Sequence, residues 1–222
     1  MKTLCVDTSS DICSVCVMQD ENVLELKELK NGKTHSENLM PLIKETLGKI
    51  KLDEIDAIAC CVGPGSFTGI RIGIAAIKAI AEVKKIPVIG VTSLESLSYN
   101  EEFDGIICTM IDARNNQVYA GIFKNHELIG DYIADDINTV LDLISENEKI
   151  LFIGNGVLIH KENILHKFGA KANFTEKNEQ TSISVGKCAC KKNKYDNADT
   201  ILPLYLRRSQ AERMKSLKDN MI

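Results

Sequence analysis

Short apolar runs separated by polar breaks open the chain. The runs at residues 2–7, 12–18 and 22–30 have the length and the spacing of strands. The polar stretch at 20–22 is typical of a hairpin turn between the second and third runs. The first thirty residues therefore predict three consecutive strands.

After residue 30 the spacing of the apolar residues changes from that of strands to that of a helix. Thr34 and Glu37 stand three residues apart, so we expect a capping box in which each side chain accepts the backbone N–H of the other residue. Pro41 lies inside this predicted helix, where it removes one backbone hydrogen bond and should cause a kink. The apolar stripe of the helix consists of Leu39, Ile43, Leu47 and Ile50.

A glycine-rich turn leads into a second predicted helix. Residues 55–62 predict a buried strand, residues 63–73 have the sequence GPGSFTGIRIG, and helical spacing extends over 67–84. A strand at 87–91 precedes a short helix that starts after Thr92 or Ser93. The predicted order is thus β-β-β-α-β-α-β-α.

The second half repeats this order more weakly, beyond a polar stretch around 99–105 that marks a boundary. We predict two α/β lobes, residues 1–102 and 103–222, each with a mixed sheet flanked by helices. The end of the chain is free to pack back on the first lobe in this scheme. The elements predicted for the second lobe are strands at 106–111, 117–123, 128–133 and 150–154, with helices at 137–147 and 182–193.

The composition is that of a globular protein with a sizeable core. The net charge of −4 argues against a protein dominated by nucleic-acid contacts. The sequence contains no apolar run of about 18 residues and no signal-peptide pattern at its start, so we expect a cytoplasmic protein without membrane contact. Residues 187–218 differ, with nine lysines and arginines against three acids. They face tRNA, an acidic partner or simply solvent.

Eight cysteines raise the question of disulfides or metal. Cys13 and Cys16 form a C-x-x-C pair, but on a strand residues three apart point to opposite faces. Most of the other cysteines also fall in apolar strand-like runs, where a free thiol behaves as a small hydrophobic group. No histidine belongs to an H-E-x-x-H motif, so we expect reduced core cysteines and no metal site.

The turn at 63–73 has two interpretations. It lacks the Gly-Lys-Ser/Thr of a P-loop, and Thr68 stands where a dinucleotide fingerprint requires glycine. It is either a ligand-binding turn or a tight strand-to-helix packing turn. Ser66 and Thr68 are better explained as N-caps of the following helix than as nucleophiles.

Small residues on the helix at 67–84 indicate that another backbone comes close. Gly69, Gly73 and Ala76 share one face, and the opposite positions Ile72, Ala75 and Ala79 are also apolar. One explanation is packing on the chain's own sheet. A helix that is apolar almost all round is buried on both sides, however, which predicts a partner surface.

These segments together resemble the bacterial TsaB (YeaZ) family. The similarity is strong over residues 1–120 and thin over 125–200. The weaker matches are Asp112-Ala113-Arg114, Val118-Tyr119 and Pro203-Leu204-Tyr205-Leu206-Arg207. The stronger matches are Cys5-Val6-Asp7-Thr8-Ser9, Thr34-His35-Ser36-Glu37, residues 63–73 and Pro87-Val88-Ile89-Gly90-Val91-Thr92-Ser93-Leu94.

The resemblance implies two RNase H-like lobes of the actin/Hsp70/sugar-kinase superfamily. It also implies a non-catalytic partner subunit in forming N6-threonylcarbamoyladenosine at position 37 of tRNAs that read codons starting with A. Such a subunit pairs with TsaD, joins TsaE in a larger complex, forms a homodimer when alone and meets tRNA only indirectly. ATP and metal are then expected on the partner subunits.

Site residues carried over from the family fall into two sets, with no catalytic or metal-binding residue in either. The predicted partner interface consists of His35, Leu39, Ile43, Gly69, Ile72, Gly73 and Ala76. The predicted vestigial nucleotide loops contain Asp7, Thr8, Ser9, Gly63, Gly65, Ser66, Asp112, Gly154 and Gly156. A small-molecule kinase or ATPase that uses Asp7 and residues 63–69 is the alternative, although neither hairpin contains the glycine that would let it close around phosphate. A peptidase lacks an evident nucleophile–base pair or metal motif.

Overall fold

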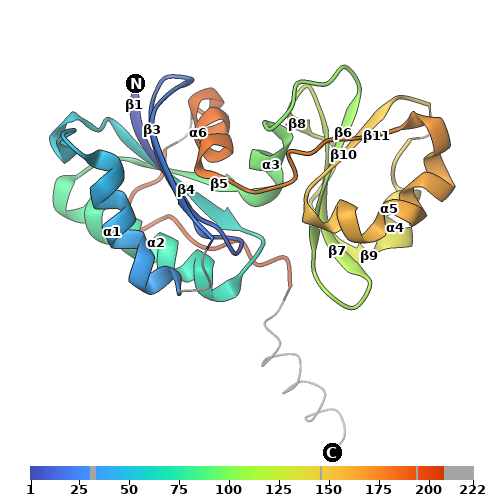
Figure 1. Cartoon of the computed structure of the whole chain (residues 1–222), viewed down its shortest axis with the longest axis horizontal. Helices are drawn as coiled ribbons and strands as arrows, with labels where there is room; N and C mark the ends of the chain where they lie inside the picture. Colours follow the sequence, from blue (N-terminus) through green and yellow to red (C-terminus); the bar gives the residue numbers. More distant parts are fainter. Residues whose placement is uncertain (31–33, 146, 194, 208–222) are drawn as a thin grey trace, which may run out of the picture.

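The computed structural model describes residues 1–30, 34–145, 147–193 and 195–207, and it has two lobes side by side, each built on one mixed sheet (Figure 1). The first sheet has the order β3-β2-β1-β4-β5. Its first hairpins are antiparallel, and β4 and β5 join β1 in parallel. The strands are β1 (Lys2–Asp7), β2 (Cys13–Gln19), β3 (Asn22–Leu29), β4 (Ala57–Gly63) and β5 (Val88–Thr92).

The second sheet repeats this topology. Its order is β11-β10-β6-β7-β8, with β9 paired to β7 on the side of β8. β6 and β7 are antiparallel, and β10 and β11 extend the sheet in parallel from β6. The strands are β6 (Ile106–Asp112), β7 (Gln117–Lys124), β8 (Glu127–Leu128), β9 (Ile133–Asp136), β10 (Ile150–Ile153) and β11 (Ala172–Phe174).

Helices cover both faces of each sheet. One helix on each sheet comes from the half of the sequence that forms the other sheet. α1 and α2 pack on the first sheet, and α4 and α5 pack on the second. α3 follows the first sheet in sequence but packs on β6 and β7, whereas α6 follows the second sheet and packs on β1, β2 and β4 (Figure 1). The helices are α1 (His35–Leu47), α2 (Phe67–Lys84), α3 (Ser93–Ser98), α4 (Ile137–Asp142), α5 (Asn155–Phe168) and α6 (Ser182–Lys191), with short 3₁₀ turns at Leu52–Glu54 and Gly169–Lys171.

Apolar side chains from opposite ends of the sequence share these cores. Val185, Cys188 and Ala189 of α6 pack against the first sheet, on the face opposite α1 and α2. Leu94 and Leu97 of α3 are fully buried against the second sheet. Neither lobe is therefore a continuous stretch of chain.

The second lobe corrects several predictions. The strand expected at 128–133 is two separate short strands, β8 and β9, and the helix expected at 137–147 ends at Asp142. Helix α5 and strand β11 were not predicted at all. The apolar residues of α5 explain the first omission, because Val157 and Ile164 face the core while Leu158 and Ile159 are exposed, so the helix has no single apolar stripe.

The start of α1 also differs from prediction. Thr34 is the N-cap residue, but its side chain makes no capping bond. Its hydroxyl lies 2.9 Å from that of Ser36 instead, so the capping box does not form. The assigned helix runs through Pro41 without a break. Among the described residues no helix has both the length and the apolar character that crossing a membrane requires.

Candidate functional site

The glycine-rich turn lies directly on the loop between β1 and β2. The backbone N–H of Ser66 donates to the Ser9 carbonyl at 2.7 Å, and a Cβ on Gly65 would overlap that same oxygen. The Thr8 hydroxyl donates to the Gly69 carbonyl at 2.8 Å. The turn is thus a close contact between two backbones, which requires glycine at its nearest points.

The two glycines of α2 complete this contact. A Cβ on Gly69 would overlap the Thr8 carbonyl oxygen, and one on Gly73 would overlap the Thr8 hydroxyl. The inference that a second backbone approaches this helix is therefore right, but that backbone belongs to the same chain. The expectation that Gly69 and Gly73 face a partner is wrong, because both are buried.

Asp7 lies beneath this contact, at the end of β1. It is fully buried, and its Oδ1 accepts hydrogen bonds from the backbone N–H and the hydroxyl of Ser9, at 2.7 and 2.6 Å. Its Oδ2 has no hydrogen-bond partner. Burial raises the pKa of Asp7, and the two bonds from Ser9 oppose that rise. In this arrangement Asp7 fixes the loop to the strand.

The same construction recurs in the second lobe. A Cβ on Gly154 would overlap the Met110 carbonyl oxygen, and one on Gly156 would lie 3.1 Å from the Asp112 nitrogen. The side chain of Asn155 accepts the Asp112 N–H at 3.0 Å. The end of β6 is therefore covered by the start of α5, as the end of β1 is covered by the start of α2.

One hydroxyl hydrogen bond joins the two lobes near these turns, and another joins the start of α3 to the glycine-rich turn. The Thr92 hydroxyl donates to the Tyr132 hydroxyl at 2.9 Å, and the Ser93 hydroxyl donates to the Pro64 carbonyl at 2.6 Å. Tyr132 packs against the cluster that surrounds α3. The predicted nucleotide-loop residues thus form two groups, one in each lobe, in which the turn at 63–66 covers the end of β1 and the turn at 154–156 covers the end of β6.

The predicted interface residues divide into buried and partly exposed ones. Leu39 and Ile43 are 1% and 3% exposed, so they join the buried Gly69 and Gly73 in the core of the first lobe. His35 is half-buried, not a free surface residue, with Nε2 2.8 Å from the Ser10 carbonyl. The remaining members, Ile72 and Ala76, are partly exposed on α2.

Other residues of α2 form a continuous exposed apolar face, and one apolar residue of α1 is exposed as well. Ala75, Ala79 and Val83 follow one another on the outer side of α2, and Val83 is 80% exposed. Met40 of α1 is 50% exposed. The sequence pattern pointed to Ala75 and Ala79, and extension of the same spacing by four residues would have found Val83. We call Ile72, Ala75, Ala76, Ala79 and Val83 the α2 ridge.

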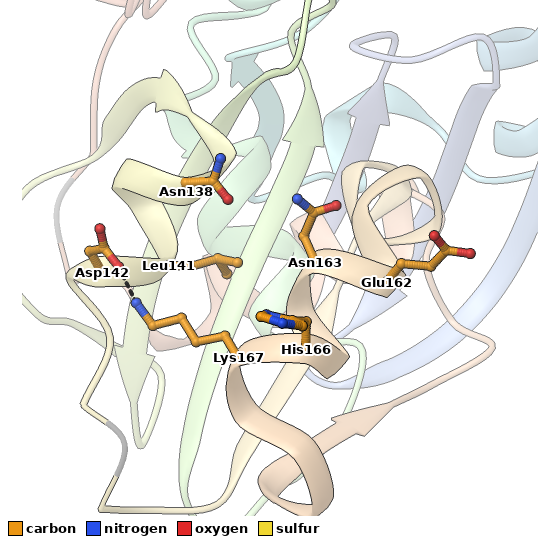
Figure 2. Close-up of a pocket in the computed structure, with 7 residues that line it drawn as sticks. All are labelled: Asn138, Leu141, Asp142, Glu162, Asn163, His166 and Lys167. Atoms are coloured by element: carbon orange, nitrogen blue, oxygen red, sulfur yellow. Dashed lines mark hydrogen bonds and ion pairs between the residues drawn. The ribbon is translucent and has the colours of Figure 1, made fainter.

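A shallow groove lies between α4 and α5 (Figure 2). Lys167 and Asp142 form an ion pair across it, and His166 lies beside them. It offers no hydrogen-bonded nucleophile and base. Within the described ranges there is also no cluster of three His, Cys, Asp or Glu residues that could hold a metal ion. The full lining is Asn138, Leu141, Asp142, Glu162, Asn163, His166 and Lys167.

The C-x-x-C pair has the geometry predicted from its spacing. Cys13 packs in the core under α1 and α2, whereas Cys16 packs under α6 on the opposite face of the sheet. All eight cysteines are free thiols. The basic segment 187–218 is described only in part, because Lys194 and residues 208–222 lie outside the described residues.

Two mixed sheets of the same order, each flanked by helices and with a glycine turn on its first hairpin, define a two-lobed α/β fold. The fold class predicted from the sequence is thus confirmed. The ethanolamine utilization protein EutJ from Carboxydothermus hydrogenoformans shares the fold with a TM-score of 0.55 at 10% identity, over 85% of this chain and 90% of that one.

The chain belongs to the TsaB (YeaZ) family, as its motifs predicted. It is 30% identical to the tRNA threonylcarbamoyladenosine biosynthesis protein TsaB of Bacillus subtilis, over 96% of each chain. The family model described as TsaD, tRNA N6-adenosine threonylcarbamoyltransferase, matches residues 29–215. The solved structure of YeaZ from Pseudomonas aeruginosa superimposes with a TM-score of 0.77 at 24% identity, over 92% of this chain and 99% of that one.

Proposed function

We propose that this chain acts in the biosynthesis of N6-threonylcarbamoyladenosine at position 37 of tRNA, as the non-catalytic partner of a TsaD subunit. The names of its TsaB relatives support the process, and the match to the TsaD family model supports common descent with the enzyme. In this proposal the chain contributes a surface, and the chemistry takes place on TsaD.

The α2 ridge is the observation that carries the proposal. A surface helix normally turns polar residues to solvent, yet α2 exposes Ala75, Ala79 and Val83 in succession. Alanine at the centre lets a second helix approach closely, and Val83 offers a larger apolar contact at one end. Contiguous apolar surface of this kind marks a protein–protein interface.

The covered turns support a non-enzymatic role. Gly65 and Ser66 occupy the space beside the β1–β2 loop where superfamily ATPases hold phosphate, and Asp7 is buried and bonded to Ser9. ATP and metal therefore belong on the partner subunits in this proposal. TsaE joins the pair in a larger assembly, tRNA contacts this chain only indirectly, and the same ridge supports a homodimer when TsaD is absent.

The test is to mix this protein with TsaD from the same organism and to measure the mass of the complex by light scattering after gel filtration. We expect a stable heterodimer with the wild type and none with Ala79→Glu, since a carboxylate at the centre of the ridge would be buried without a partner. Gly73→Arg is unsuitable for this test because Gly73 is buried, so the variant would disturb the fold as well as any pairing.

Leu158→Glu is the matched control, because Leu158 is a 63% exposed apolar residue on α5, in the other lobe. We expect this variant to pair normally. If the wild type stays a monomer beside TsaD and hydrolyses ATP, with the activity lost in Asp7→Ala, the kinase or ATPase alternative replaces this proposal.

A further inference from the structure

The last described residues of the chain run beside α2. The ammonium group of Lys78 donates to the Asp199 carbonyl at 3.5 Å, and the N–H of Leu204 donates to the Val62 carbonyl at 2.8 Å. Between these points Ile201 is buried in the first core, while Leu202 is 67% exposed. We call residues 199–205 the terminal segment. Figure 1 shows the chain passing from α6 to the vicinity of α2 over the last residues that the structure describes.

Arg71 joins the terminal segment to α2. The rings of Phe67 and Tyr205 stack with centroids 4.8 Å apart and planes within 7° of parallel. The Arg71 guanidinium carbon lies 5.4 Å from the Tyr205 centroid and 6.0 Å from that of Phe67. Its Nε donates to the Tyr205 hydroxyl at 2.6 Å. The guanidinium is therefore held by two aromatic rings and one hydrogen bond at an exposed position.

No carboxylate in the described part of the chain forms an ion pair with Arg71. A guanidinium has five N–H donors, and the Tyr205 bond uses one of them. The outer edge of the group remains available for the two parallel hydrogen bonds that a carboxylate accepts. Because the group is already held in place, such a bond would cost little side-chain entropy.

We infer that α2 and the terminal segment form one docking surface, on which Arg71 binds a carboxylate of the protein that covers the α2 ridge. This inference rests on the proposed function. It adds the terminal segment to the surface and names the group that Arg71 would bind. Arg71 precedes Ile72 and lies one turn before Ala75, so it borders the ridge. Leu202 is an exposed apolar residue of the terminal segment, and arginine and tyrosine are typical anchors of such surfaces.

The occupant is thus a protein with an aspartate or glutamate at the border of an apolar contact. The test measures the dissociation constant of the complex between this protein and TsaD from the same organism, by calorimetry at low and at high salt. We expect Arg71→Gln to weaken pairing about tenfold or more and to flatten the salt dependence. Arg71→Lys should recover only part of the loss, because an ammonium group lacks the planar fork. Leu202→Ser should weaken pairing as well.

Two control variants match these changes in the other lobe. Lys161→Gln removes an exposed cation that lies 4.9 Å from the Phe174 ring, and Leu158→Ser removes an exposed leucine from a helix. Both should pair like the wild type. Tyr205→Phe keeps the ring stack but removes the hydroxyl that holds Arg71, and we expect a smaller loss from it than from Arg71→Gln.

The outcomes separate this inference from the proposed function. Wild-type affinity in both Arg71→Gln and Leu202→Ser, together with no pairing in Ala79→Glu, would overturn the inference and leave the function in place. Absence of pairing by the wild type would overturn both. A thermal unfolding curve for each variant shows that a loss of affinity does not come from loss of fold.

Discussion

The Thr8 hydroxyl donates to the Gly69 carbonyl at 2.8 Å, across 61 positions of sequence. This bond joins the β1–β2 loop to the first turn of α2, where Gly69 and Gly73 leave no room for a side chain. In this chain, the glycine-rich motif that identifies the family allows two backbone segments to pack closely together. The glycines of this motif pack in the interior, whereas the α2 ridge lies on the outer side of the same helix.

The contact between Thr8 and Gly73 predicts that the cost of a substitution at position 73 depends on the residue at position 8. Gly73→Ala should lower the free energy of unfolding by about 1–3 kcal/mol, because the new methyl group overlaps the Thr8 hydroxyl. In a Thr8→Ala background the cost should fall, since the obstructing oxygen is gone. Gly69→Ala should not be rescued in this way, because it overlaps the Thr8 backbone carbonyl. Urea unfolding of the double-mutant cycle checks this, and equal costs in both backgrounds would contradict it.

Asp7 predicts a pH dependence of stability. Burial raises its pKa in the folded protein, so its contribution to stability is fully present below the unfolded pKa of about 3.9 and is lost as pH rises through the folded pKa. Asp7→Asn cannot ionise. We therefore expect the stability of this variant relative to wild type to increase as pH rises above about 4, and to level off once Asp7 is charged. Parallel stability curves from pH 4 to 8 would refute a raised pKa.

The exchanged helices predict a single unfolding transition. Leu97 of α3 and Val185 of α6 are both fully buried, each against the sheet of the other lobe. Leu97→Ala should lower stability by about 2–5 kcal/mol and shift the whole transition without splitting it. Leu158→Ala, at an exposed position of α5, should change stability by about 0.5 kcal/mol or less. Two resolved transitions in calorimetry would show that the lobes unfold independently.

The cysteines predict a simple pattern of thiol reactivity. Burial raises the pKa of Cys61 to about 12 and that of Cys13 to about 11, and seven of the eight thiols are buried. Cys190 alone is partly exposed. Burial also raises the pKa of Cys190, but its partial exposure lets an aromatic disulfide reagent reach it, so at pH 8 one thiol should react in the folded protein and the others only after unfolding. Cys190→Ser should remove this reaction, and reaction of several thiols in the folded protein would contradict the buried arrangement.

The first lobe was largely predictable because its signals are local. Most strands there are short apolar runs and α1 has one apolar stripe, while the glycine-rich turn and Thr92 or Ser93 mark the starts of α2 and α3, so local signals located β1 to β5 and α1 to α3. The second lobe was less so. Helix α5 has apolar residues on both its buried and exposed sides, and its backbone is non-helical at His160, so no single period marks it.

The candidate site shows the same division. Sequence alone placed Asp7 and Asp112 at strand ends and located the glycine-rich turn that follows β4. It could not tell which face of α2 is inside, because Gly69 and Gly73 on one side and Ala75 and Ala79 on the other are all small. Burial decides that question, and burial depends on the position of Thr8 in the folded chain.

The sequence by itself determined the family, the α/β class and the repeated order of elements, since these depend on motifs and on hydrophobic spacing within short windows. Only the tertiary structure decided that the lobes exchange α3 and α6 and that the glycine turns cover the strand ends. It also brought the terminal segment beside Arg71. These relationships join residues that are far apart in the chain, and local spacing carries no information about which distant segment fills a given space.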